Sequence, residues 1–304
     1  MDETRASTTA LGSSLMRAVH TRLDRPPLID DPWGDRLVLE SERQAVAKLI
    51  LRGLDPATRA QIDTLDSVAA LEAALRAHLG YGWAIVRTKY AEDALEAAVA
   101  GGVRQYVILG AGFDSFALRQ PTFAREVAIF EIDHPTTQHL KRQRLRDCGV
   151  PLPRNLHFVP ADLGQEKPGT ALARSSFSPT EPAFFSWLGV TQYLTHEANI
   201  ATLRGIAGCA AAGSELVFTY VDERELGPDR LSVDLGRVQS TVVSTEPWLS
   251  GFAPARLAHD LRAVGMILVE DLSGQEARQR YCRERRDGLS PAPAFHIARA
   301  QVVR

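Results

Sequence analysis

The second two thirds of the chain contain seven short apolar runs that alternate with helical segments. Strands covered on both faces read as uninterrupted apolar runs, which is typical of a parallel sheet. Helical stretches over 135–147, 195–212 and 255–264 can provide the crossovers between them. We therefore predict an α/β fold with a Rossmann-like, doubly wound, mostly parallel sheet, with an antiparallel pair at its end. The seven predicted strands lie at about 106–109, 127–130, 156–159, 183–187, 215–220, 266–269 and 296–303.

The first hundred residues have a different pattern, with apolar positions at helical spacing over 9–22, 34–51, 56–78 and 84–100. The proline- and aspartate-rich stretch 26–32 interrupts this series, and Gly101-Gly102 ends it. We expect two units: residues 1–101 as an N-terminal helical cap packed on the core, and residues 102–304 as a cofactor-binding domain. Within the second unit, the long segment at about 222–255 is predicted to be a lid-like insertion.

Composition limits the classes of partner. The 304 residues include 35 Lys plus Arg against 37 Asp plus Glu, so the net charge is −2, and 45% of the residues are hydrophobic. This balance is that of a globular protein and argues against a dedicated nucleic-acid binder. Cys148, Cys209 and Cys282 have no metal-ligand spacing, which favours a reducing compartment. With neither a signal-like start nor a long apolar run, we expect a cytoplasmic protein without membrane or metal; the oligomeric state is left open.

The first predicted strand leads into a glycine-containing loop, Gly110-Ala111-Gly112. Glycines at the carboxyl end of a strand permit a tight turn and bring backbone N–H groups close to a ligand. The third glycine of a dinucleotide motif is absent, because Ser115 stands there. A nicotinamide-dependent oxidoreductase is therefore disfavoured.

Acidic residues follow the next two predicted strands. Asp133 lies 23 residues after Gly110, where a carboxylate can accept hydrogen bonds from both hydroxyls of a ribose. It could also cap the helix that begins at Pro135, and the two roles are compatible. Asp162 follows the third strand, so the three strand ends together predict one crevice for a nucleoside without a pyrophosphate.

Five ordered motifs resemble the leucine carboxyl methyltransferase family of class I S-adenosylmethionine-dependent methyltransferases, and its bacterial O-methyltransferase branch in particular. The similarity extends over nearly the whole chain, including Thr9-Ala10 and Arg17-Ala18 near its start. The motifs are RTKY at 87–90, LGAGFDS at 109–115, EIDHP at 131–135, ADL at 161–163 and TEPW at 245–248.

The resemblance implies an O-methyltransferase that uses S-adenosyl-L-methionine and acts on a carboxylate or hydroxyl of a small molecule. Arg87 would bind the methionyl carboxylate, and the loop of Gly110, Ala111 and Gly112 would approach the methionine part. Asp133 would hold the ribose hydroxyls. The adenine would lie between Asp162 and Leu163.

Two residues depart from the family pattern. Leu188 stands where members usually carry a glutamate that helps to bind the cofactor, and Phe116 stands where close relatives often have arginine. The first departure motivates an alternative hypothesis, a cofactor-free binding or scaffold protein with a degenerate site. The second departure, Phe116, would change only the packing of the loop that follows the first strand.

A carboxylate acceptor needs no general base, whereas a hydroxyl acceptor would need one nearby. The candidates near predicted strand ends are Tyr193, His134, His196 and Tyr220, and Tyr193 is preferred as the catalytic residue because it lies in a family motif. Trp83 and Trp248 could line an apolar acceptor pocket. The basic clusters at 141–146 and 278–286 are predicted to be solvated helix faces.

Overall fold

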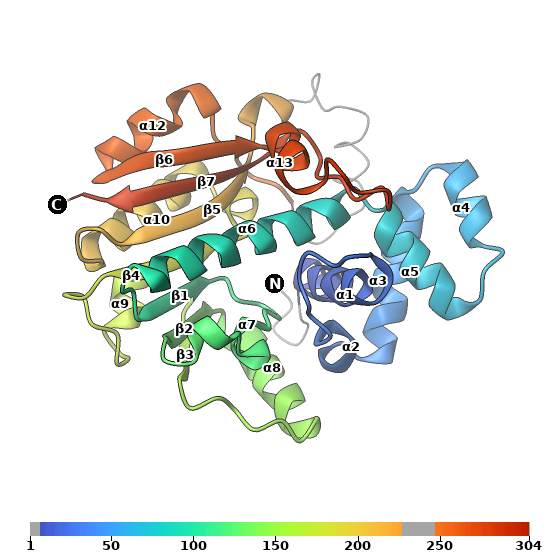
Figure 1. The fold of residues 1–304 in the computed structure, drawn as a ribbon, viewed down its shortest axis with the longest axis horizontal. Coiled ribbons are helices and arrows are strands. Elements are labelled where there is room, and N and C mark those ends of the chain that lie inside the picture. The colour runs from blue at the N-terminus through green and yellow to red at the C-terminus, as the bar shows by residue number, and fades with distance from the viewer. Residues whose placement is uncertain (1–6, 227–246, 304) are drawn as a thin grey trace.

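The computed structural model describes residues 7–226 and 247–303, and within these ranges the chain forms a seven-stranded sheet with helices on both faces (Figure 1). The strand order is β3-β2-β1-β4-β5-β7-β6. β1 to β5 pair in parallel, and β7 is antiparallel to both β5 and β6. The predicted fold class, with its antiparallel end, is confirmed. The strands are β1 (Gln105–Leu109), β2 (Ala128–Asp133), β3 (Leu156–Pro160), β4 (Ala183–Trp187), β5 (Glu215–Val221), β6 (Met266–Ser273) and β7 (Phe295–Val302).

Successive strand residues face opposite sides of the sheet, and both sides are apolar. Tyr106 and Ile108 of β1 belong to one hydrophobic cluster, and Val107 and Leu109 belong to the other. The first cluster includes residues of α6 (Gly80–Ala100), α8 (Pro135–Asp147) and α13 (Gly274–Tyr281). The second includes residues of α9 (Pro168–Leu172), α10 (His196–Cys209) and α12 (Pro254–Ala263). This burial on both faces explains the uninterrupted apolar runs in the sequence.

The N-terminal helices lie beyond the carboxyl ends of the parallel strands (Figure 1). α6 connects the two regions, because it contacts α1 and α5 as well as β4 and β5. The first hydrophobic cluster accordingly runs from Leu15 of α1 to Ile297 of β7 without interruption. These helices are α1 (Thr8–Leu23), α2 (Gly34–Leu37), α3 (Glu40–Gly53), α4 (Pro56–Ile62) and α5 (Ser67–Ala77).

Two of the predicted helices are each divided in the structure. The segment 34–51 breaks at Val38, and 56–78 breaks after Ile62. In the second case Asp66 forms a new N-cap, since its Oδ1 accepts hydrogen bonds from the backbone N–H groups of Val68 and Ala69. The helical spacing of the apolar residues continues through the break, so the sequence pattern does not reveal the new N-cap.

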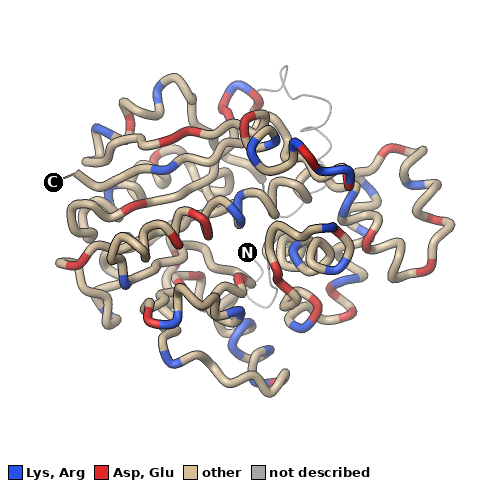
Figure 2. The backbone as a smooth tube through the Cα atoms, in the orientation of Figure 1, with Lys and Arg blue, Asp and Glu red and all other residues tan. Residues whose placement is uncertain are grey.

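The prediction of a solvated basic face at 141–146 is wrong for two of its residues. Lys141 is fully buried and pairs with Glu131 at 2.6 Å. Arg144 donates to the backbone oxygen of Leu37 at 2.7 Å, and its guanidinium lies over the ring of Phe113. These charges therefore join α8 to its neighbours. Figure 2 shows acidic and basic residues alternating over both the sheet region and the N-terminal helices.

Candidate functional site

The loop after β1 needs glycine at two positions. Gly110 has φ +65° and Gly112 has φ +51°, which is left-handed backbone that L side chains rarely adopt. A Cβ on Gly110 would also lie 2.5 Å from Cγ2 of Val190. The backbone N–H groups of Gly110 and Ala111 donate to the carbonyl oxygen of Ile132, at 2.8 and 3.2 Å. The loop is thereby held against the end of β2.

Asp133 lies at the end of β2, and its carboxylate turns toward this loop. Its Oδ2 accepts a hydrogen bond from the backbone N–H of Gly112, and its Oδ1 accepts one from the N–H of His134 at 2.6 Å. Burial raises the pKa of Asp133, although both hydrogen bonds oppose the shift. The expectation that Asp133 also caps the next helix is wrong, because His134 is the N-cap of α8.

Asp162 follows β3 and turns back on its own loop. Its Oδ1 accepts from the backbone N–H of Gly164 at 2.9 Å, and its Oδ2 accepts from Nε2 of Gln165 at 3.0 Å. Leu163, the next residue, is half-buried beside it. The pair contributes one polar and one apolar side chain to the cavity described below.

Arg87, on α6, is an enclosed cation. Its guanidinium donates to Oγ of Ser13 at 3.3 Å and has no carboxylate partner among the residues that the structure describes. Gly189, after β4, has φ +71°, and a Cβ there would lie 2.4 Å from Nη1 of Arg87. Burial lowers the pKa of Arg87 to about 10, with Tyr193 opposing the shift and Arg17 adding to it. Such a group suits an anionic ligand.

All the predicted site residues line one cavity of about 280 Å³ at the carboxyl edge of the sheet. Sequence reasoning missed the role of several other lining residues, above all Ser13 and Val190. No local signal marks them, because they approach the cavity from α1 and from the turn after β4. The predicted residues are Arg87, Gly110, Ala111, Gly112, Asp133, Asp162, Leu163 and Tyr193.

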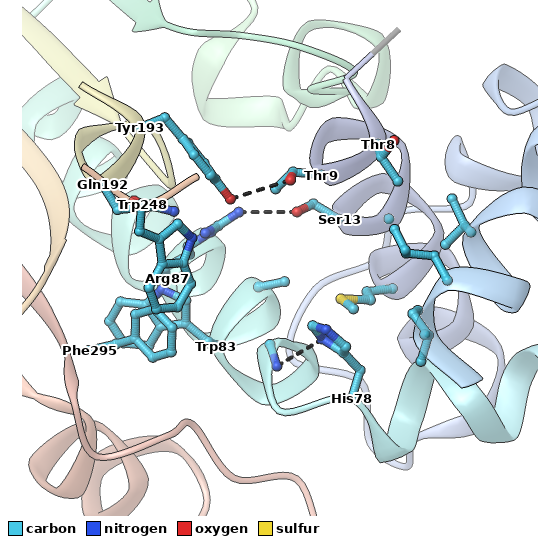
Figure 3. Close-up of a pocket in the computed structure, with 17 residues that line it drawn as sticks. Thr8, Thr9, Ser13, His78, Trp83, Arg87, Gln192, Tyr193, Trp248 and Phe295 are labelled. Carbon is cyan, nitrogen blue, oxygen red and sulfur yellow. Dashed lines mark hydrogen bonds between the residues drawn. The ribbon is translucent and has the colours of Figure 1, made fainter. Parts of the chain in front are cut away.

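A second, smaller pocket of about 90 Å³ shares part of its wall with this cavity (Figure 3). The predicted apolar residues Trp83 and Trp248 do line it, together with Phe295 of β7. Trp83 stacks on Phe295 with ring centroids 5.0 Å apart, and Trp248 meets Phe295 edge-on at 5.9 Å. Aliphatic side chains form the opposite wall. The residues common to both pockets are Thr9, Ser13, Arg87 and Tyr193.

The four candidate bases lie in different parts of the structure. Tyr193 lies in the short 3-10 helix η2 (Thr191–Tyr193), and its hydroxyl lies 3.3 Å from Oγ1 of Thr9 in the shared wall. His134 lines only the larger cavity. Tyr220 and His196 line neither: the Tyr220 hydroxyl donates to Asp271 at 2.7 Å, and His196 is exposed against the ring of Phe252. These two candidates are therefore discarded.

The two departures from the family pattern have different surroundings. Leu188 is half-buried and lines the larger cavity between Ser186 and Gly189. Phe116 is fully buried, packs edge-on against Tyr106 at 5.1 Å and lines neither pocket. Phe116 thus belongs to the packing beneath the loop, whereas Leu188 faces the site.

The comparisons with known proteins agree with this geometry. A family model described as leucine carboxyl methyltransferase matches residues 10–207. A protein of Bacillus subtilis (strain 168), named "Putative S-adenosyl-L-methionine-dependent methyltransferase YktD", is 32% identical over 99% of both chains. One of Mycolicibacterium paratuberculosis, likewise named an S-adenosyl-L-methionine-dependent methyltransferase, is 32% identical over 74% of this chain and 68% of its own.

Solved structures support the fold. A crystal structure from Thermobifida fusca, described as a methyltransferase, matches with a TM-score of 0.58 at 15% identity and covers 96% of this chain and 94% of its own. A protein of Streptomyces avermitilis matches with a TM-score of 0.53 at 16% identity, over 84% of this chain and 96% of its own. With the family match and the full-length relative, the conclusion is that this chain belongs to the leucine carboxyl methyltransferase family of S-adenosyl-L-methionine-dependent methyltransferases.

Proposed function

We propose that this protein transfers the methyl group of S-adenosyl-L-methionine to a carboxylate oxygen of a small molecule. The larger cavity would hold the cofactor and the smaller pocket the acceptor. Their shared wall, which contains Arg87 and Tyr193, is where the two reactants would meet. When bound, the cofactor supplies a methyl group on an electrophilic sulfonium.

The residues of the larger cavity fit this cofactor. Arg87 is an enclosed guanidinium that lacks a carboxylate partner among the described residues, so it can pair with the methionyl carboxylate. The left-handed turn at Gly110 and Gly112 lines the cavity with backbone, which the methionine part could approach closely. Each oxygen of Asp133 accepts one backbone hydrogen bond and keeps a second lone pair for a ribose hydroxyl. Asp162 and Leu163 would flank the adenine.

The titratable groups of the acceptor pocket favour a carboxylate over a hydroxyl. Among the described residues that line this pocket, only His78, Arg87 and Tyr193 titrate. Burial lowers the pKa of His78 to about 4, so this imidazole is a poor base at neutral pH. Among the described residues of this pocket there is no carboxylate, and the one imidazole lies away from the shared wall, so none of them suits the removal of a proton from a phenol or alcohol, whereas a carboxylate is already ionised. This is the observation that carries the choice of acceptor group.

The protein would then act mainly by positioning. Methyl transfer requires the acceptor oxygen in line with the S–CH3 bond, and a fixed geometry supplies much of the rate gain. We assign Tyr193 to hold the acceptor oxygen through its hydroxyl. The N-terminal helices, within residues 1–101, would act as a cap that shapes the acceptor pocket. Most of the predicted lid at 222–255 lies outside the described residues, but Trp248 contributes to the aromatic wall.

Calorimetric titration with S-adenosyl-L-methionine and S-adenosyl-L-homocysteine tests the cofactor assignment. We expect both to bind, Asp133→Ala to abolish binding and Arg87→Ala to weaken it severely. If neither compound binds the parent protein, the chain is a cofactor-free binding or scaffold protein and the proposal fails. If both variants bind like the parent, the site assignment fails.

The acceptor group is tested by the stability of the product. The protein would be incubated with methyl-labelled cofactor and a panel of one-ring carboxylic acids and phenols. A methyl ester releases labelled methanol in mild alkali, whereas an aryl methyl ether does not. We expect alkali-labile label from the acids; label that resists alkali would make the acceptor a hydroxyl.

A further inference from the structure

His78 brings an imidazole into the otherwise mainly apolar part of the acceptor pocket. It lies between α5 and α6, and Figure 3 shows its ring directed among the lining side chains. Its Nδ1 accepts a hydrogen bond from the backbone N–H of Gly80 at 3.0 Å. The ring is therefore fixed in position by the start of α6.

This hydrogen bond also decides the tautomer. A backbone N–H can only donate, so Nδ1 must be the unprotonated ring nitrogen and the hydrogen must be on Nε2. Burial keeps the ring neutral at pH 7, because it lowers the pKa of His78 to about 4. Nε2 makes no hydrogen bond to any residue in the described part of the chain. It is a neutral donor that has no partner among the described residues.

The walls of the pocket form a slot with two polar ends. Figure 3 shows the rings of Trp83, Trp248 and Phe295 on one side. Aliphatic side chains, including Met16 and Ile50, come from α1 and α3 on the other. The wall shared with the cofactor cavity lies at one end, and His78 lies away from it. A flat apolar body would bury its two faces against these walls.

We propose that the acceptor is a planar, one-ring carboxylic acid that carries a neutral hydrogen-bond acceptor away from its carboxylate, and that His78 Nε2–H binds this second group. The proposal rests on the function proposed above, because the carboxylate must lie at the shared wall. His78 is then a specificity-determining residue. The pocket measures about 90 Å³, less than the engineered cavity of ~150 Å³ that holds benzene, so it has no room for more than one ring, and the carboxylate must extend into the wall shared with the larger cavity.

Isosteric probes test this class of acceptor. Trp83 and Trp248 line the pocket, so quenching of intrinsic fluorescence reports its occupation. The 3- and 4-hydroxybenzoates would be titrated against the 3- and 4-methylbenzoates, with S-adenosyl-L-homocysteine at saturation. In the parent protein we expect one hydroxy isomer to bind about 3- to 10-fold more tightly than its methyl counterpart, which is the value of one net hydrogen bond.

Two variants separate the donor from the structural role of the ring. In His78→Asn the amide oxygen can still accept from Gly80 N–H, but no donor reaches the position of Nε2. In His78→Gln a donor can reach that position, while the hydrogen bond to Gly80 is lost. We expect the preference for the hydroxy isomer to vanish or reverse in His78→Asn and to persist in His78→Gln.

The binding of S-adenosyl-L-homocysteine distinguishes a failure of this inference from a failure of the proposed function. If the parent binds S-adenosyl-L-homocysteine but binds none of the benzoates, or prefers the methyl isomers, the acceptor class is wrong while the cofactor assignment stands. A preference that survives in His78→Asn would show that another group supplies the donor. If S-adenosyl-L-homocysteine does not bind the parent, the proposed function and this inference fail together.

Discussion

The hydroxyl of Ser115 donates a 2.6 Å hydrogen bond to the carboxylate of Asp31, and so joins the loop after β1 to the segment between α1 and α2. Asp31 is fully buried and also accepts from Nε of Arg17 at 2.7 Å. Arg17 in turn donates to the backbone oxygen of Phe113 at 2.9 Å. The N-terminal helices thus hold the proposed cofactor loop from outside the sheet.

We predict that Ser115→Ala and Ser115→Gly weaken the binding of S-adenosyl-L-homocysteine about 3- to 10-fold and lower the free energy of unfolding by about 1–2 kcal/mol. The buried carboxylate of Asp31 loses one of its donors in both variants. The glycine variant restores the third glycine of a dinucleotide motif, so it separates the hydroxyl from the backbone. Calorimetry and urea unfolding measure the two effects. Parent-like binding in Ser115→Gly would mean that backbone freedom, and not the hydroxyl, matters at this position.

Leu188 offers a second test, because it lines the proposed cofactor cavity at the position where the resemblance to the family implies a glutamate. We predict that Leu188→Glu tightens the binding of S-adenosyl-L-methionine, since a carboxylate there would attract the positively charged methionyl part. Leu188→Gln has a similar size without the charge and serves as the matched control. Calorimetry on both variants isolates the electrostatic effect. Equal affinities of the glutamate variant and the parent would show that the site has compensated for the missing acid.

The sheet and its binding loop could be predicted because their signals are local. Strands buried on both faces are continuous apolar runs, and the left-handed turn at Gly110 requires the residue type that the sequence shows. The position of Asp133 in the site could be predicted because this residue ends the next strand. In these cases the neighbouring sequence alone limits the structure.

The acceptor pocket has no such local signal. Its residues come from α1, α3, the junction of α5 and α6, α6 itself, η2, β7 and the segment around Trp248, and only the folded chain brings them together. His78 was hidden within the apolar period of 56–78, and Ser115 was interpreted only as a missing glycine. The burial of Lys141 could likewise not be predicted from its own helix, which has few apolar residues, because that burial depends on Glu131 in a different element.

That buried pair gives a third prediction. Glu131 and Lys141 are both about 1% exposed in their side chains, and Oε1 of Glu131 has no hydrogen-bond partner among the described residues. Burial raises the pKa of Glu131 to about 7, with Lys141 opposing the shift, so the test is made at pH 8.5, where the carboxylate is ionised. We expect Glu131→Gln to lower the free energy of unfolding by about 3–5 kcal/mol, because it leaves Lys141 buried without an anion.

The double variant Glu131→Gln with Lys141→Met is expected to recover most of this loss, since it removes both members of the pair. Urea unfolding of the parent, the single variant and the double variant measures the difference. A double variant as unstable as the single one would contradict the explanation by an unpaired buried charge.

The last prediction concerns the pH dependence of stability at His78. An unfolded histidine has a pKa of about 6.5, whereas burial lowers the pKa of His78 to about 4 in the folded protein. Between these values the unfolded chain binds the proton more readily, so the free energy of unfolding rises with pH. The contribution is fully present above pH 6.5, is lost as the pH falls through about 4, and amounts to at most about 3–4 kcal/mol. We expect His78→Asn to flatten the decline in stability between pH 6.5 and 4, measured by urea unfolding at several pH values. The same substitution at the exposed His259 is the control and should leave the slope unchanged.

A slope in His78→Asn equal to that of the parent would contradict this prediction. It would mean that His78 is protonated as easily in the folded protein as in the unfolded chain, and it would remove the argument that this ring is a poor base in the acceptor pocket.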